Sequence, residues 1–450
     1  MSGAQFGKDL TEGNVTKQLI GFAFPFFISQ ILQATYSMAD MFLAGIFMGD
    51  HGIAAINNSS VVIMLITMLV NGFSLSGTVL VAQYMGAKKP EDASKTIGTL
   101  FKVFIYAGIT ITIFGQLITD KILILLNTPE ESIVEAERYL RICFTGTLFI
   151  CGYNAVSAVL RGLGDSKKPL YYVAIATVVN IVLDIIFMGV FNWGAAGAAI
   201  ATIMAQGIAF LLAVYSLYKN NFVFDFKLKS FVIYKEKLEV ILKIGLPAAI
   251  QSTIVNFSML FVITTINGYG LSASTTAGIG GKIDSYAILP VIAISHSVAS
   301  MVGQNLGAGH IERAKQTVFA GMRISIVFGI LMYLTVSSFG MQIGEMFKCS
   351  EEALEIVVMY TKYVSLGYMA NSIVFLMNGL ATGSGNAWFS LLNAFTNVVV
   401  SRLFFIWLFE SVFEMGLFGV FLGMGVGQYA GIITSFIFYF SKKWQRSIVK

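Results

Sequence analysis

Apolar windows of about 20 residues recur along the whole chain, and each is long enough for one helix to cross a bilayer. Twelve such windows begin near residues 18, 53, 97, 133, 170, 194, 238, 272, 317, 353, 387 and 416. The composition agrees, since 56% of the residues are hydrophobic and only 12% are charged. The sequence therefore predicts an all-α polytopic membrane protein with twelve transmembrane helices.

The loops between these windows alternate in charge, and this alternation sets the expected orientation. Basic residues gather at the N-terminus, around 88–95 and 161–168, in 219–243, at 313–315 and in the C-terminal tail, whereas acidic residues gather at 130–137 and 351–355. By the positive-inside rule, both termini are cytoplasmic and the protein is a multi-pass protein of the cell membrane. The net charge of +5 follows from this topology, so we expect no nucleic-acid partner.

The two halves of the chain resemble each other at four places. The matching pairs are 17–25 with 243–247, 82–87 with 303–308, 161–165 with 382–386, and 194–197 with 416–419, and their anchor positions are equally spaced to within one residue. Each half holds six spans, so both halves start on the same side of the membrane and the repeats are parallel. We expect an N-terminal lobe (1–218), a cytoplasmic linker (219–237) and a C-terminal lobe (238–450), with a central cavity of alternating access.

Two carboxylates fall inside apolar windows of the N-terminal lobe. Asn180 and Asp184 are four residues apart and share a helix face, while Asp40 and Thr202 lie on the first and sixth spans. At 1.5 Å per residue, Asp40, Asp184 and Thr202 each lie roughly 10 to 12 Å below the outer surface. A carboxylate at that depth costs roughly 2.5 to 3.5 kcal/mol on insertion scales, so a chain that keeps one usually uses it. We therefore predict one cation site formed by these four residues.

The predicted ligands are all oxygen atoms, which suit a hard cation such as Na⁺, and two close carboxylates can instead hold a proton. The sequence does not decide between Na⁺ and H⁺, and no other cofactor is expected. The alternatives are that Asp40 is solvated at the interface and that Asp184 is neutralised by an interhelical hydrogen bond. Asn180 and Thr202 without the carboxylates would be ordinary helix-packing residues.

Further polar residues inside the windows are candidates for lining the substrate cavity. On the first span, Gln30, Gln33 and Ser37 form a stripe that ends at Asp40. The C-terminal lobe does not repeat the acids, and its candidates are Gln251, Asn256, Lys282, Asp284, Asn371, Asn378 and Arg402. A purely structural pairing of Asp284 with Lys282 or Arg402 is as good an interpretation as substrate binding.

Pro25 and Pro247 lie inside matching first helices of the two lobes, where a proline removes a backbone hydrogen bond and permits a kink. We expect both to act as hinges, with cation binding at Asp40 biasing the kink at Pro25. Alignment anchored on these prolines places Val262 opposite Asp40. The residue opposite Asp184 depends on where a gap is placed, and is Ser401, Phe405 or Ile406.

Pro25 followed by Asp40, the element AQYMGA at 82–87, the loop RGLGDSKKP at 161–169 and the segment NIVLD at 180–184 resemble the MATE family (multidrug and toxic compound extrusion) of the MOP superfamily. The resemblance covers nearly the whole chain. It implies secondary antiport, in which Na⁺ or H⁺ enters as a cationic or amphipathic organic compound leaves. It also implies a monomer whose partners are small organic cations and membrane lipid.

One branch of this family carries acids on the seventh and tenth helices, and this chain has none there. It is more similar to the DinF-like and MepA-like branches, which have a first-lobe site, than to the NorM-like branch. The runner-up function is a lipid-linked precursor flippase of the same superfamily, which would need a strongly cationic cavity to hold a pyrophosphate. The buried bases are few, namely Lys102, Arg141, Lys282, Arg323, Lys362 and Arg402.

Motifs for chemistry are missing from the sequence. There is no metalloprotease, serine-hydrolase or P-loop motif. The three cysteines form neither a disulfide framework nor a metal-binding pattern. We therefore expect no enzymatic activity within this chain and no metal beyond a possible Na⁺.

Overall fold

The computed structural model describes residues 8–126, 128–219 and 222–449, and within these residues every regular element is helical. Eleven of the helices are long and apolar enough to cross a membrane. A further pair, Glu351–Val364 (α11) and Leu366–Gly383 (α12), is bent by 43° and makes twelve spans when it is counted as one. The predicted all-α membrane architecture is confirmed.

The chain packs into two compact units, and the units do not coincide with the two halves of the sequence. Unit 1 is formed chiefly by Phe24–Gly245, and unit 2 by Leu10–Ala23 together with Leu246–Lys450. The lobes expected from the sequence are defined by internal similarity, whereas these units are defined by packing. They differ because a short arm ahead of each repeat belongs to the unit built from the other repeat.

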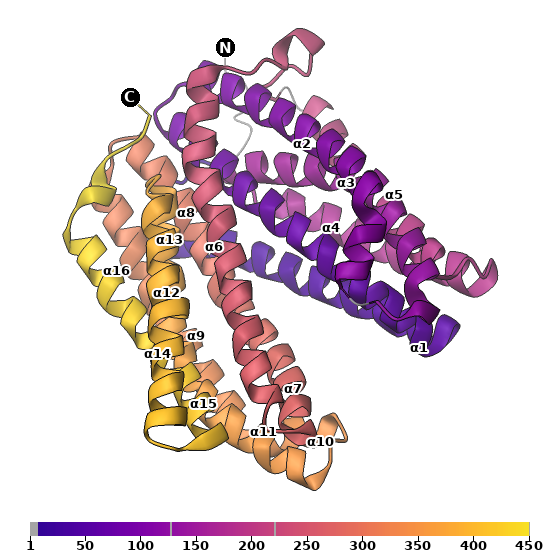
Figure 1. Ribbon diagram of the computed structural model, residues 1–450. Coiled ribbons are helices and arrows are strands. Elements are labelled where there is room, and N and C mark those ends of the chain that lie inside the picture. Colours follow the sequence, from indigo (N-terminus) through magenta and orange to yellow (C-terminus); the bar gives the residue numbers. More distant parts are fainter. Residues whose placement is uncertain (1–7, 127, 220–221, 450) are drawn as a thin grey trace. The chain divides into compact units, whose positions relative to one another are not determined.

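Unit 1 is a bundle of long helices (Figure 1). Its elements are α1 (Val15–Gly86), α2 (Pro90–Leu125), α3 (Glu130–Gly162), α4 (Lys167–Asp184), the π-helical segment η1 (Ile185–Val190), α5 (Gly194–Lys219) and the 3₁₀ turn η2 (Leu228–Ser230). α3 packs against α2 and α5, and α4 packs against α5. α1 contains two spans that meet at Gly49, whose φ of 66° is a conformation that glycine adopts without strain.

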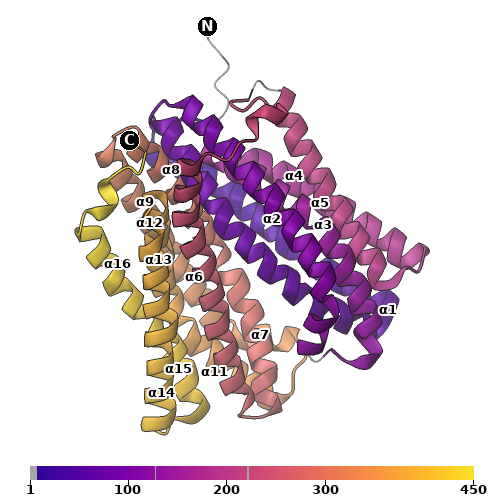
Figure 2. The same cartoon turned by 45° about the horizontal axis from the view of Figure 1, so that its top comes forward.

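Unit 2 is centred on α12, which packs against α8, α9, α13 and α16 (Figure 2). Its elements besides α11 and α12 are α6 (Lys235–Asn267), α7 (Leu271–Ala287), α8 (Leu289–Gly307), α9 (Ile311–Ser338), α10 (Gly340–Met346), α13 (Ala387–Ala394), η3 (Phe395–Ser401), α14 (Arg402–Trp407), η4 (Leu408–Val412), α15 (Gly416–Val426), η5 (Gly427–Tyr429), α16 (Ala430–Phe440) and η6 (Lys443–Gln445). The segments η3 and η4 are π-helical, and η4 occupies the place in this repeat that η1 occupies in the first.

The N-terminal arm, residues 10–23, is bound firmly to unit 2. Arg313 donates hydrogen bonds to the carbonyl oxygens of Leu10 (3.3 Å) and Gly13 (2.7 Å). Leu10 and Leu19 are fully buried in the hydrophobic core of this unit. The first turns of α1 are therefore part of unit 2, although the rest of that helix belongs to unit 1.

The linker arm, residues 222–245, is bound to unit 1 in the same manner. Lys237 is 6% exposed, and its Nζ donates to Asp92 Oδ1 at 2.7 Å. The rings of Phe224 and Phe101 meet edge to face at 5.6 Å. The described part of the segment that the sequence predicts to be a linker is thus a packed part of unit 1.

The two arms dock at equivalent positions of the repeats. Asp92 corresponds to Arg313, at the same spacing that matches position 82 with position 303. Asp92 holds its arm through Lys237, whereas Arg313 holds its arm through backbone carbonyl oxygens. The chain passes between units after residues 23 and 245, and a proline follows shortly afterwards in each case, Pro25 and Pro247.

Replacing Lys237 with methionine is expected to lower the stability of unit 1 by about 1 to 3 kcal/mol, because it leaves Asp92 without its charge-assisted hydrogen bond. Thermal unfolding of the purified protein in detergent measures the change. Lys229 is exposed in the same arm and makes no ion pair within the described residues, so Lys229→Met is the matched control. Equal unfolding temperatures for the two variants would show that the linker arm is not anchored through Lys237.

Candidate functional site

Asp40, Asn180 and Asp184 come together in the interior of unit 1. Asp40 on α1 is 6% exposed, and Asn180 and Asp184 on α4 are fully buried. The carboxyl group of Asp40 lies close enough to both α4 residues to interact with them. Their spacing of four residues puts the two α4 side chains on one helix face. Three of the four predicted ligands thus share one buried location.

Asp184 is the last residue of α4, at the point where the regular helix changes to the π-helical segment η1. A π-helix pairs residues five apart instead of four, so side chains beyond Asp184 leave the register of an unbroken α-helix. Such segments occur frequently at functional sites. The backbone irregularity next to Asp184 is therefore a second feature that sets this part of α4 apart.

The polar atoms of this cluster lack hydrogen-bond partners. Both carboxyl oxygens of Asp184, Oδ1 of Asp40 and both polar side-chain atoms of Asn180 are buried without a partner in the part of the chain that the structure describes. Buried polar atoms in folded proteins are nearly always paired. An unpaired carboxylate within a membrane protein is costly. The donor set is therefore complete only when a cation or a proton occupies it, and its oxygen atoms fit either.

Thr202 on α5 joins the cluster through Tyr36, a residue that the sequence analysis missed. The Oγ1 atom of Thr202 is buried without a partner among the described residues. Tyr36 lies next to Thr202 and near the carboxyl groups of Asp40 and Asp184. The available signal was its position one turn before Asp40 on the same helix face. A tyrosine on an apolar helix is too common for that spacing to stand out.

The corresponding positions in unit 2 form an apolar contact. The spacing between matched positions grows by one residue from the pair 161 and 382 to the pair 194 and 416, and the additional π-helical segment η3 lies in that interval, where it accommodates the extra residue. The counterparts of Asp40, Asp184 and Thr202 are then Val262, Ile406 and Met424. All three lie in one hydrophobic cluster. The fold therefore brings these positions together in both repeats, but places carboxylates there in only one.

The predicted cavity residues on the first helix of each repeat do not join the buried cluster. Gln33 and Ser37 are exposed, Gln33 Nε2 donates to Gln30 Oε1 (3.5 Å), and Ser37 Oγ donates to the Gln33 carbonyl (3.2 Å). On α6, Gln251 is half-buried and Asn256 donates to a backbone carbonyl one turn earlier (2.8 Å). Their assignment to a substrate cavity stays a prediction.

Asp284 of unit 2 is held by two tyrosines instead of a base. Tyr360 Oη donates to Oδ2 at 2.7 Å, and Tyr368 Oη donates to Oδ1 at 2.5 Å. Arg402 lies near enough to interact electrostatically, but no base forms an ion pair with Asp284 among the described residues. Lys282 is exposed. The pairing of Asp284 with Lys282 that the sequence suggested is therefore not formed, and Arg402 acts only at longer range.

Arg402, the counterpart of Asn180, is bound by Gln428. With the Gln428 amide oriented to satisfy its neighbours, its oxygen accepts from Arg402 Nε (3.2 Å) and Nη2 (2.5 Å), and its nitrogen donates to Asn371 Oδ1 (3.0 Å). Asn378 Oδ1 accepts from Asn393 Nδ2 (3.1 Å). These predicted polar residues of unit 2 thus belong to internal hydrogen-bond networks, in contrast to the unpartnered cluster in unit 1.

Replacing Asp284 with alanine is expected to destabilise unit 2, because it removes the acceptor of two tyrosine hydroxyls. Each hydroxyl left unpaired costs about 1 to 3 kcal/mol. Thermal unfolding in detergent should show a fall of several degrees. Asp284→Asn keeps one acceptor oxygen and serves as the control with the smaller loss. An unchanged unfolding temperature for the alanine variant would contradict a structural role for this network.

The MatE family model matches the chain twice, over residues 25–186 and 247–408. The second match starts and ends at the counterparts of the first, at the spacing that relates Pro25 to Pro247, so the two matches confirm the internal duplication. Together they cover more than half of the chain. Each match begins at one of the two prolines that follow the crossings between units.

Individual relatives cover nearly the full length. The chain is 30% identical to the probable multidrug resistance protein YpnP of Bacillus subtilis over 97% of both sequences, and 25% identical to the multidrug export protein MepA of Staphylococcus aureus over 82% of both. A solved outward-facing multidrug resistance MATE family transporter of the MOP superfamily matches with a TM-score of 0.92, at 22% identity over 98% of both chains. The chain belongs to the MATE family of multi-pass membrane transporters.

Proposed function

We propose that this protein is a secondary antiporter that exports cationic and amphipathic organic compounds and takes up H⁺ or Na⁺ at Asp40, Asn180, Asp184 and Thr202. The observation that carries the proposal is the set of buried oxygen atoms without partners in the described part of unit 1. A permanent structural role would leave these atoms paired, as they are around Asp284 in unit 2. A site that is emptied and refilled in each cycle has to lack permanent partners.

The coupling step follows from charge and connectivity. When the site is empty, the carboxylates of Asp40 and Asp184 repel each other, and a bound cation or proton removes that repulsion. Asp40 lies on α1 beyond Pro25, whereas Asp184 lies on α4, so occupancy changes the force between these two helices. A ligand shifts a conformational equilibrium only by its difference in affinity for the two states. Occupancy therefore selects one shape of α1 and, through it, one direction of access.

The export of drug-like compounds is supported by the relatives. YpnP is described as a probable multidrug resistance protein and MepA as a multidrug export protein. The described bases inside unit 2 are engaged, since Arg402 binds Gln428, and this gives no support to a strongly cationic cavity. Export of organic cations is therefore favoured over transport of a lipid-linked pyrophosphate.

The orientation and assembly belong to the same proposal. The basic loops and the basic C-terminal tail place both termini in the cytoplasm of a cell whose plasma membrane contains the protein. We propose a monomer, since each repeat supplies one unit of the transporter. Reporter fusions at the termini, one active only in the cytoplasm and one active only outside, test the orientation.

Efflux from proteoliposomes tests the function. Protein is reconstituted in vesicles loaded with a fluorescent organic cation, and a Na⁺ gradient and a pH gradient are imposed separately. Accelerated efflux under one gradient is expected and identifies the coupling ion. No acceleration under either gradient, together with saturable binding of a lipid pyrophosphate by the purified protein, would replace this proposal with the flippase.

A further inference from the structure

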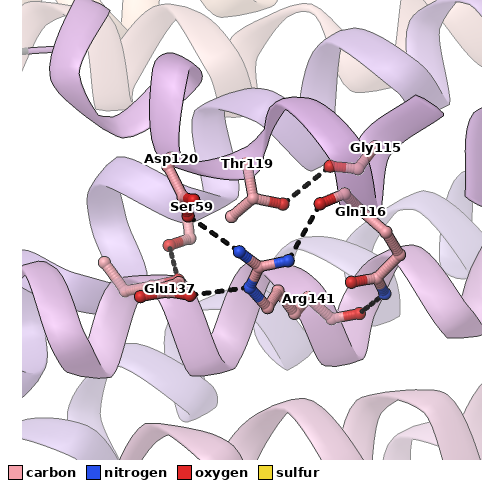
Figure 3. A network of polar contacts seen from close by, with 8 residues as sticks. Ser59, Gly115, Gln116, Thr119, Asp120, Glu137 and Arg141 are labelled. Carbon is pink, nitrogen blue, oxygen red and sulfur yellow. Dashed lines mark hydrogen bonds and ion pairs between the residues drawn. The ribbon is translucent and has the colours of Figure 1, made fainter. Parts of the chain in front are cut away.

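Two arginines on helix α3 have opposite surroundings. Arg141 donates to Asp120 Oδ1 (2.8 Å), Glu137 Oε1 (2.7 Å) and the Gln116 carbonyl (2.8 Å), and its guanidinium points at all three acceptors (Figure 3). Arg161 lies near the end of the same helix and is partly buried. Within the described residues it makes no hydrogen bond and has no carboxylate within hydrogen-bonding reach. The two arginines differ because one has its acceptors built into the fold and the other does not.

The guanidinium of Arg161 is nevertheless held in place. Its Cζ lies 5.6 Å from the centre of the Phe26 ring, in the arrangement of a cation–π contact. Such a contact engages the flat face of the guanidinium and leaves the N–H groups at its edge without acceptors. The nearest acid on the following loop, Asp165, is bound by Lys168 at 3.6 Å and by the backbone N–H of Lys167 at 3.0 Å.

Two buried hydroxyl groups near Arg161 also lack partners. Ser157 is 1% exposed and Tyr172 is 7% exposed, and neither Ser157 Oγ nor Tyr172 Oη has a hydrogen-bond partner in the described chain. Tyr153, Ser157 and Arg161 follow each other at steps of four and share one face of α3. Tyr153 lies near all three of Ser157, Arg161 and Tyr172. Its hydroxyl donates to the Pro169 carbonyl at 3.2 Å, which fixes α4 against α3.

The second repeat shows that these positions adjoin one another in the fold. When position 161 is aligned with position 382, the counterparts of Ser157, Arg161 and Tyr172 are Asn378, Thr382 and Asn393. In unit 2 these three bind each other, since Thr382 Oγ1 donates to the Asn378 carbonyl (2.7 Å) and Asn393 Nδ2 donates to Asn378 Oδ1 (3.1 Å). The same place in unit 1 holds a cation and two hydroxyl groups that do not satisfy one another.

We infer that Arg161, Ser157 and Tyr172 form a binding site for a phosphate-type oxyanion. A guanidinium edge matches the geometry of a phosphate group, and charge-assisted hydrogen bonds of this kind are among the strongest in proteins. The two hydroxyls supply further donors for the remaining oxygen atoms. Tyr172 is about three turns before Asp184 on α4, so the site lies about 18 Å along that helix from the carboxylates. It is distinct from the cation cluster and does not depend on the proposed antiport.

The oxyanion has two possible sources, a phospholipid headgroup and free phosphate. Native mass spectrometry of the delipidated full-length protein, titrated with dioleoyl phosphatidylglycerol, tests the first source. Thermal unfolding in inorganic phosphate against chloride at equal ionic strength tests the second. Saturable binding of the lipid alone assigns the site to a headgroup, and stabilisation by phosphate alone assigns it to the free anion. Saturable binding of neither probe by the wild-type protein overturns the inference.

Variants tie the binding to the three side chains. Arg161→Gln is expected to raise the dissociation constant of the bound probe at least about tenfold, and Arg161→Lys to recover part of the loss because it keeps the charge without the fork. The double variant Ser157→Ala and Tyr172→Phe keeps the charge and removes the hydroxyls, and is expected to weaken binding about threefold to tenfold. Arg323 is exposed in unit 2, so Arg323→Gln is the matched control. Wild-type affinity in both Arg161→Gln and the double variant would overturn the inference.

Discussion

Asp184→Asn is expected to lower gradient-driven efflux by roughly 5-fold to 150-fold, the range that corresponds to typical coupling free energies between two ligands. The carboxyl oxygens of Asp184 are fully buried without partners in the described chain. An amide of the same size keeps the packing but removes the negative charge that a cation or a proton must neutralise. Efflux from proteoliposomes under the coupling gradient measures the loss.

The same substitution is expected to leave the fold intact. An uncharged amide is less costly than an unpaired carboxylate at this depth, so the unfolding temperature should stay the same or rise. Binding of the organic substrate without a gradient should persist. Asp225→Asn removes an acid from the exposed linker arm and is the matched control. Gradient-driven efflux at the wild-type rate by Asp184→Asn would remove the assignment of this site.

The meeting of Asp40 and Asp184 was predictable from the sequence because the rise of a helix per residue is fixed. Counting residues from the outer loops placed both acids at one depth, and the structure brings them together. Tyr36 was not predictable, because depth alone does not say which way a side chain points. The rotation of each helix about its axis is set by packing with its neighbours, and that packing is a property of the whole bundle.

The partners of Asp284 show the same limit. A search for opposite charges selects Lys282 and Arg402, yet two tyrosines hold the carboxylate. Tyrosine is frequent and versatile in membrane helices, so its sequence position carries little information about a polar role. The internal repeat gave a further constraint only after the segment η3 had shown where one extra residue is accommodated.

The twelve spans were predictable because hydropathy and length are local properties, but the exchange of arms between the units was not. Similarity between the halves assigns each first helix to its own repeat. In the structure, the arms at 10–23 and 222–245 pack on the unit formed mainly by the other repeat. This exchange depends on tertiary contacts such as those of Arg313 and Lys237, which involve residues that the sequence shows only as members of basic loops.

Pro25→Ala is expected to reduce gradient-driven efflux about tenfold or more while leaving the cation site intact. Alanine restores the backbone N–H that bonds to the carbonyl of Gly21 in a regular helix. A helix interior is about 3 kcal/mol more stable with alanine than with proline. If the transport cycle needs α1 to bend at this point, the straight form gains up to that amount. Efflux and cation binding, measured on the same preparation, separate a hinge defect from a damaged site.

The exchanged arms explain why these positions should control transport. Arg313 fixes the arm before Pro25 on unit 2, and Lys237 fixes the arm before Pro247 on unit 1. Any change in the relation between the units must then be taken up at the two crossings, each just before a proline. Pro247→Ala is therefore expected to impair efflux as Pro25→Ala does.

A matched substitution separates a hinge from a general effect of proline. Pro90 is exposed at the first turn of α2, where a backbone N–H has no partner in any helix. Pro90→Ala should leave efflux unchanged. Because both crossings must bend in one cycle, stiffening either one already blocks it, and the double variant Pro25→Ala with Pro247→Ala should be little worse than each single variant. Wild-type efflux in both single variants would show that the crossings do not act as hinges.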